Sequence, residues 1–166
     1  MFNPVFLTFE IMEENEYIKR AIDLATQNVT EGGGPFGAVI VKDGKIFAEG
    51  VNRVTETNDP TAHAEVQAIR KACEKLHTFD LSGYEIYSSC EPCPMCFSAI
   101  YWAHISKVYY AATHHDAEDA GFADALIYRE VKLKPLERSI PFLKIDHPQK
   151  ITPFEVWLKK EDKEKY

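Results

Sequence analysis

The sequence predicts an α/β fold in which helices cover both faces of a layered sheet, and two observations lead to this class. The apolar runs 38–41 and 46–48 flank Lys42-Asp43-Gly44-Lys45, and Asp-Gly between apolar runs is a strong hairpin signal. After this hairpin, helical and strand-like segments alternate, which is typical of layered α/β proteins. A chain of 166 residues is most simply one domain that can bury a real core.

The first helix is predicted over 13–29, where apolar residues recur at helical spacing, and the glycine run 32–34 with Pro35 ends it. This run is reminiscent of a phosphate-binding loop, but it lacks the Gly-Lys-Ser/Thr sequence and leads into a strand. We therefore expect an ordinary loop. The apolar stretch 1–12 is predicted to be an extension that precedes a single domain over 13–166.

The second helix is predicted to open at Asp59-Pro60, an N-cap candidate followed by proline. Cys73 falls on its apolar stripe, so we expect a packed hydrophobe there. A buried strand is predicted over 84–89. The helix from Pro94 to Trp102 is apolar nearly all round and is therefore predicted to be internal.

The last third of the sequence predicts four elements. They are a strand over 107–112, a short helix within 117–128, a fifth strand over 140–145, and a helix after a capping box formed by Thr152 and Glu155. Ligands of such sheets bind beyond the carboxyl ends of strands, where helices begin. Residue 63 and the Pro92–Cys96 stretch both fall at such positions.

Composition describes an ordinary globular protein, with 45% apolar and 27% charged residues. The net charge is −7 and no basic stripe is present, which weighs against a nucleic-acid partner. The apolar run near the N-terminus is too short to span a bilayer and lacks a basic leader. Three of the four cysteines lie within 90–96, which indicates metal chemistry in a reducing compartment. We therefore expect a cytoplasmic protein with no membrane partner.

His63, Cys93 and Cys96 are the candidate metal ligands. One nitrogen and two sulfurs suit Zn²⁺, and three protein ligands leave a fourth position open, as in catalytic zinc sites. Cys90 would also permit a set of three sulfurs. We favour His63, because Cys90 is expected at a strand end before the turn at Pro92.

Glu65 follows His63 by two residues and is the candidate proton carrier. The pattern H-x-E with P-C-x-x-C is the signature of zinc nucleobase deaminases, in which the glutamate is a general acid/base and not a ligand. If Cys90 joined the other three ligands, the site would be closed and structural. A non-enzymatic zinc module is therefore the alternative to an enzyme.

Two stretches, TNDPTAHAE at 57–65 and SCEPCPMC at 89–96, resemble the cytidine and deoxycytidylate deaminase superfamily. Within it, GGPFGA at 33–38, AIYWA at 99–103 and DAGFAD at 119–124 are similar to the bacterial guanine deaminases, as is a tail that ends in tyrosine. The resemblance implies a three-layer α/β/α sandwich with a mixed five-stranded sheet and one Zn²⁺ cofactor. It covers the chain from about residue 13 to the end.

The resemblance further implies hydrolysis of guanine to xanthine and ammonia, with Glu65 as the proton carrier. Asn52 would face the base, Phe36 would form an aromatic wall, and Asp124 would act as a second acid that binds a purine N–H or moves a proton. The terminal Tyr166 would belong to a segment that closes the site. In this family the segment is exchanged between two subunits, so a homodimer exchanging about 139–166 is expected.

Other substrates of the same chemistry remain open at this point: guanosine, cytosine, or adenosine in tRNA. The acidic charge disfavours tRNA, and the length of the guanine-like stretches disfavours cytosine. A small purine base is the expected partner.

Overall fold

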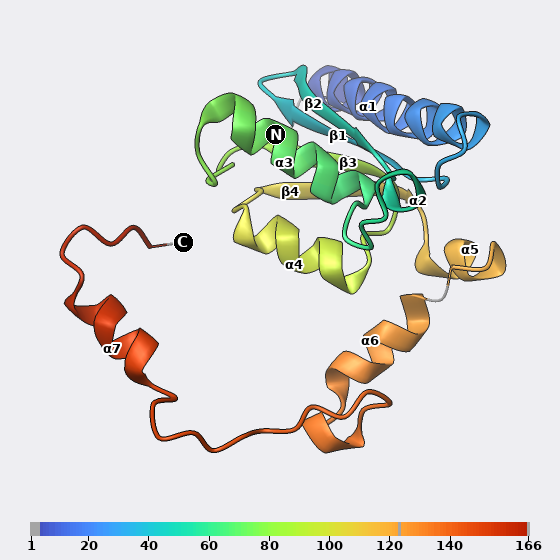
Figure 1. Ribbon diagram of the computed structural model, residues 1–166. Coiled ribbons are helices and arrows are strands. Elements are labelled where there is room, and N and C mark those ends of the chain that lie inside the picture. The colour runs from blue at the N-terminus through green and yellow to red at the C-terminus, as the bar shows by residue number, and fades with distance from the viewer. Residues whose placement is uncertain (1–3, 123, 166) are drawn as a thin grey trace.

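The computed structural model describes residues 4–122 and 124–165, with side chains from residue 14 onward (Figure 1). Its sheet has the strand order β2-β1-β3-β4. β1 runs antiparallel to both β2 and β3, whereas β3 and β4 are parallel. The strands are β1 (Gly37–Lys42), β2 (Lys45–Val51), β3 (Glu85–Cys90) and β4 (Lys107–Ala112). The predicted mixed α/β class is confirmed, with four strands in the described chain and not five.

The predicted hairpin joins β1 to β2. Its turn residues, Asp43 and Gly44, have φ angles of 49° and 70°. Two consecutive positive φ values are those of a type I′ turn, which matches the twist of antiparallel strands. The Asp-Gly signal therefore identified both the hairpin and its turn.

Helices cover the sheet on both faces (Figure 1). α1 (Pro4–Thr30) lies on one face, where Val39, Val41 and Tyr87 form a small apolar core with side chains of α1. α3 (Ala64–Leu76) and α4 (Pro94–Trp102) cover the other face, where Ala38 and Ile40 join the larger core. Alternate residues of β1 thus enter opposite layers, because successive side chains of a strand point to opposite faces.

Two glycines allow the helices to approach the sheet closely. A Cβ atom at Gly37 would lie 2.3 Å from the Ala21 carbonyl oxygen of α1. A Cβ atom at Gly50 would lie 2.1 Å from the Ala64 carbonyl oxygen of α3. Both contacts are with backbone atoms, so neither position tolerates a side chain without moving a helix. Gly50 thereby fixes the start of the helix that follows His63.

The second helix begins later than predicted. Asp59 does not cap it: its Oδ1 instead accepts hydrogen bonds from Thr61 N at 2.8 Å and Thr61 Oγ1 at 2.7 Å. This local turn satisfies the Thr61 N–H outside a helix. α3 therefore starts at Ala64, with His63 as its extended N-cap residue.

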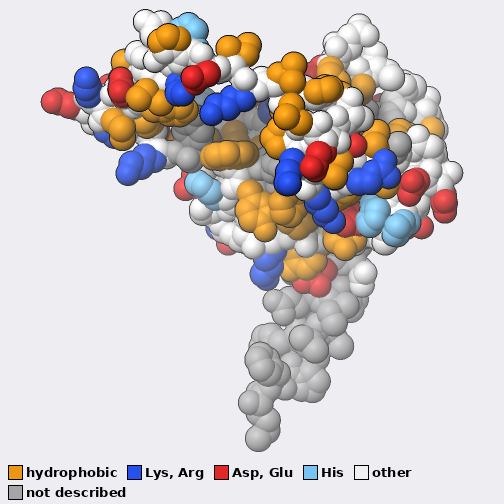
Figure 2. All heavy atoms as spheres, turned by 90° about the horizontal axis from the view of Figure 1, so that it is seen from below, with side chains coloured by type: hydrophobic (Ala, Val, Ile, Leu, Met, Phe, Trp, Pro, Cys, Tyr) orange, Lys and Arg blue, Asp and Glu red, His pale blue; other side chains and the backbone are white. Residues whose placement is uncertain are grey.

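The prediction that the 94–102 helix is internal is wrong. α4 buries Cys96 and Ile100, but Phe97, Tyr101 and Trp102 are 52%, 67% and 62% exposed. An all-apolar helix needs cover on every side, and among the described residues α3, α6 and the sheet core contact α4 without covering these three side chains. Hydrophobic side chains form several patches on the face seen in Figure 2.

The predicted helix within 117–128 is in fact two helices, α5 (His114–Asp119) and α6 (Asp124–Lys132). Gly121, with φ +93°, lies between them in a conformation that side chains rarely adopt. The break places Asp124 in the first turn of α6.

We call residues 133–165 the arm. It contains a 3₁₀ turn (Pro135–Glu137) and α7 (Thr152–Lys159), and it extends away from the sheet (Figure 1). The predicted strand over 140–145 is wrong: this segment pairs with no strand among the described residues, and Ile140 and Ile145 are 74% and 81% exposed. The capping box is also wrong, because Ile151 is the N-cap residue of α7. An apolar pattern becomes a strand only where a partner strand is available.

The predicted extension is helical from residue 4 and continuous with α1. Within the described residues, every helix is too short or too polar to cross a membrane.

Candidate active site

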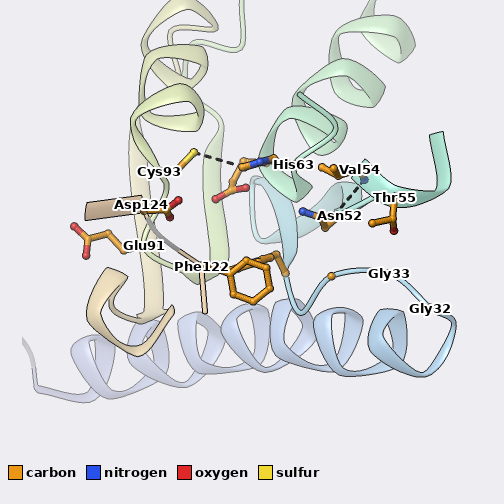
Figure 3. Close-up of a pocket in the computed structure, with 13 residues that line it drawn as sticks. Gly32, Gly33, Asn52, Val54, Thr55, His63, Glu91, Cys93, Phe122 and Asp124 are labelled. Carbon is orange, nitrogen blue, oxygen red and sulfur yellow. Dashed lines mark hydrogen bonds between the residues drawn. The ribbon is translucent and has the colours of Figure 1, made fainter. Parts of the chain in front are cut away.

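His63, Cys93 and Cys96 come together where two helices begin. His63 is the N-cap residue of α3, Cys93 is the N-cap residue of α4, and Cys96 lies in the first turn of α4. His63 Nδ1 is 3.5 Å from Cys93 Sγ, as Figure 3 shows, and 3.6 Å from Cys96 Sγ. Residues thirty positions apart in the sequence thus present three donor atoms to one point.

The three donor atoms fit a zinc ion. They all lie within 4.8 Å of one another. Tetrahedral zinc, with bonds of about 2.3 Å to sulfur and about 2.0 Å to nitrogen, places such atoms about 3.5 Å apart. Cys90 does not join them: its Sγ donates to the Thr113 carbonyl oxygen at 3.5 Å. Among the described residues, the site therefore offers three protein ligands and leaves one tetrahedral position for a molecule from solvent.

The two thiols differ in their protonation: Cys93 favours the thiolate, whereas the hydrogen bond with Cys93 and burial raise the pKa of the Cys96 thiol. Hydrogen bonds from Cys96 and His63 hold the pKa of the Cys93 thiol well below its usual value. The same contact with Cys93 raises the pKa of His63. A thiolate is the form of cysteine that binds zinc, and a helix N-terminus favours it.

Glu65 lies beside these ligands in the first turn of α3 and is only 6% exposed. Ser88 Oγ donates to its Oε1 at 3.2 Å, and Cys96 Sγ donates to its Oε2 at 3.4 Å. Burial raises the pKa of the Glu65 carboxyl. A carboxyl group with a raised pKa beside the candidate metal ligands is suited to taking up and releasing a proton.

A cavity of about 340 Å³ opens in front of His63 and Glu65. Such a volume is in the range of small-ligand sites. Phe36 and Phe122 form an aromatic wall, with ring centroids 4.8 Å apart at 82°. The remaining lining residues come from the glycine loop, the start of α2 (Val54–Thr57), the metal loop and α6: Gly32, Gly33, Gly34, Asn52, Val54, Thr55, Glu91, Cys93 and Asp124.

Asn52 follows β2 and is 8% exposed. Its Oδ1 accepts a hydrogen bond from Val54 N at 3.2 Å, so its amide nitrogen is the group that points into the cavity (Figure 3). The side chain therefore presents a donor to whatever occupies the cavity.

Asp124 lies on the cavity side of Cys93 (Figure 3). Burial and the nearby Cys93 raise the pKa of its carboxyl. One turn later on α6, Tyr128 donates from its hydroxyl to the Pro92 carbonyl oxygen at 2.9 Å. This bond ties the helix that carries Asp124 to the loop that carries Cys93. Tyr166, the predicted lid residue, lies outside the described residues.

Several residues of the cavity could not be predicted from the sequence. Phe122 lay within a stretch already noted for its family resemblance, but its pairing with Phe36 depends on the break at Gly121. Glu91 lines the cavity and accepts a hydrogen bond from His114 Nδ1 at 2.6 Å. Thr55 also lines the cavity, but a threonine that follows a strand is common and does not by itself indicate a binding site.

The fold and the site agree with a known family. Residues 12–112 match the model of the cytidine and deoxycytidylate deaminase zinc-binding region. The chain belongs to this family of zinc-dependent deaminases, which confirms the resemblance found in the sequence.

Comparison with individual proteins narrows the class. The chain is 53% identical to the guanine deaminase of Bacillus subtilis over 156 residues, which are 93% of this chain and 100% of that protein. A crystal structure of the Bacillus subtilis enzyme covers 92% of this chain and 98% of its own, with a TM-score of 0.90. The tRNA-specific adenosine deaminase of Aquifex aeolicus is 43% identical over 101 residues, 61% of this chain and 67% of that protein.

Proposed function

We propose that the protein hydrolyses guanine to xanthine and ammonia. The observation that carries this proposal is the 53% identity to a guanine deaminase along that protein's whole length, including the segment after β4. The similarity to the tRNA deaminase covers a smaller part of the chain. The part of the chain that is similar to the guanine deaminase but not to the tRNA deaminase therefore favours a free base as the substrate over tRNA.

In this proposal His63, Cys93 and Cys96 hold the zinc ion. When bound, zinc supplies a Lewis acid that makes water a nucleophile near neutral pH. A structural zinc module would need a fourth protein ligand, and the Cys90 thiol is engaged by the Thr113 carbonyl oxygen. Three ligands with an open position support an enzyme.

Glu65 moves the protons of the reaction. A carbon–oxygen bond forms at C2 of guanine, and the bond from C2 to the exocyclic nitrogen breaks. Glu65 accepts one proton from the attacking water and delivers it to a ring nitrogen. It then takes the second proton from the oxygen bonded to C2 and gives it to the departing amine, which leaves as ammonia. Burial favours this cycle because the neutral carboxyl is stabilised, so the proton is held between the two transfers.

The walls of the cavity select and orient the base. The Asn52 amide nitrogen faces the cavity and would donate to an acceptor on the purine edge, such as O6 or N7. Phe36, supported edge-on by Phe122, would pack against the ring face. Asp124 would accept from a purine N–H at the opposite end of the cavity, where it can also exchange a proton.

The arm supports the proposed homodimer. Phe142, Phe154 and Leu158 are 57%, 68% and 70% exposed, and large exposed apolar surfaces mark interaction sites. Exchange of the arm between two chains would cover these side chains and bring Tyr166 over the partner's cavity. All four cysteines are free thiols, which fits the proposed cytoplasmic location.

The test is ammonia release from a panel of substrates by the zinc-loaded protein. We expect kcat/KM for guanine to exceed those for cytosine, adenine, adenosine and guanosine by at least about 10²-fold, because donors placed for one purine edge are left unpaired by the others. Xanthine should accumulate in equal amount to ammonia. Faster turnover of another substrate, or no turnover of any, would overturn the proposal.

A further inference from the structure

Asn28 is a buried amide at the end of α1 that the reaction does not use directly. It is 3% exposed, and its Nδ2 donates to two carbonyl oxygens, those of Gly34 and Asn52, each at 2.8 Å. These carbonyls belong to two different walls of the cavity. We propose that Asn28 is a positioning residue that sets the Asn52 side chain for recognition of the base, an inference that rests on the proposed function.

The glycine loop is built around this amide. Gly33 N donates to the Asn28 carbonyl oxygen at 2.8 Å, so the loop turns back over the end of α1. A Cβ atom at Gly33 would lie 2.3 Å from Asn28 Nδ2, so the amide occupies the space that a side chain there would need. The glycine loop therefore packs directly against the Asn28 side chain, and this packing fixes the position of Gly34.

The position of Gly34 in turn constrains Asn52. A Cβ atom at Gly34 would lie 3.0 Å from Asn52 Cγ, which places the loop directly against the Asn52 side chain. On its other sides, Asn52 N donates to the Phe36 carbonyl oxygen at 3.1 Å, and Asn52 Oδ1 accepts from Val54 N. The backbone is held by Asn28 and Phe36, and the side chain by Gly34 and Val54. The amide nitrogen is left with one direction, into the cavity.

Only a neutral amide can perform this role at position 28. Both hydrogens of Nδ2 are used, one for each carbonyl, and a carboxylate of the same shape would face two oxygen atoms without a proton. The site is buried, so an unpaired carbonyl there loses a hydrogen bond that water replaces poorly. The bond to the Asn52 carbonyl oxygen links α1 directly to a residue that lines the cavity.

The test is a double-mutant cycle with guanine. Asn28→Ala is expected to raise KM about tenfold while kcat falls by less than about threefold, because a misplaced donor weakens binding of the base more than the chemistry at zinc. In an Asn52→Ala background the same substitution should change KM by less than about twofold. Gln27→Ala is the control, since Gln27 bonds Glu31 on the exposed side of the same helix. Equal effects of Asn28→Ala in both backgrounds would overturn the proposal.

A second measurement does not depend on the substrate. Hydrogen–deuterium exchange of the zinc-loaded, ligand-free Asn28→Ala protein should increase in 31–36 and 52–56 and stay unchanged in 94–102. If wild-type protein does not deaminate guanine but exchange rises locally, the proposed function is wrong and the role of Asn28 in holding Asn52 stands. Unchanged exchange in both segments, or an increase throughout the chain, would contradict the positioning role whichever base is the substrate.

Discussion

The sheet with its covering helices and the arm differ in what protects their apolar side chains. In the sheet region, Ile40, Ile86 and Tyr87 are at most 1% exposed, and Cys93 and Cys96 are buried in a smaller apolar cluster with Val66. In the arm, Ile140, Leu143 and Ile145 are all more than 70% exposed. Within the described chain, the candidate metal ligands and Glu65 are thus assembled on the sheet region, whereas these apolar side chains of the arm are open to solvent. The predictions below separate these two regions.

Loss of a metal ligand should give the largest effect. Cys96→Ser is expected to abolish zinc retention and to lower kcat/KM by at least about 10³-fold, because a serine hydroxyl is a poor ligand for zinc. Zinc content after gel filtration and initial rates provide the measurement. Cys73→Ser, away from the site, is the control and should retain both. Full zinc content in the Cys96→Ser protein would remove this residue from the ligand set.

Deleting the arm should separate activity from folding. A chain ending at Lys132 is expected to keep its zinc and a cooperative unfolding transition, while kcat/KM falls roughly 10²-fold because the cavity is left open. Sedimentation of the intact protein should show a dimer, and that of the shortened chain a smaller species. Unchanged activity of the shortened chain would mean that the arm has no part in the site.

Gly50→Val should disturb the site through the fold. A side chain at this position meets the Ala64 carbonyl oxygen, so α3 must shift together with His63 and Glu65. We expect a loss of about 1–3 kcal/mol in the free energy of unfolding, measured by urea denaturation, and weaker zinc binding. Unaltered stability would show that α3 can move away from β2 at little cost.

The smallest effect is expected at Arg20, which pairs with Glu49 through two hydrogen bonds of 2.7 Å. Both side chains are partly exposed, so Arg20→Ala should cost less than about 1 kcal/mol at neutral pH. The bond lowers the pKa of Glu49 below its ordinary value of 4.5. The stabilisation is therefore complete above that value and disappears as the pH falls through the lowered pKa. A difference between the two proteins that persists in strong acid would contradict this pairing.

Local signals in the sequence predicted the sheet region well and the arm poorly. Asp43-Gly44 determines its own turn, and the spacing of Cys93 and Cys96 determines their place on one helix. The start of α3 was predicted at Asp59, but the Asp59 side chain accepts hydrogen bonds from Thr61 in a turn that precedes the helix. The apolar periodicity is the same whether an aspartate caps a helix or forms such a turn. The segment 140–145 has the composition of a strand, but a strand also needs a partner. The proposed role of Asn28 depends on contacts among the end of α1, the glycine loop and the residue after β2, and no local sequence pattern predicts such contacts.

The most direct test is the turnover of guanine by zinc-loaded Glu65→Gln protein. Glutamine keeps the shape of the side chain and the hydrogen bond to Ser88, but it cannot carry a proton. We expect full zinc content and a fall in kcat of roughly 10³-fold or more. Turnover close to that of the wild type, with zinc bound, would show that another group moves the protons and that the proposed chemistry is wrong.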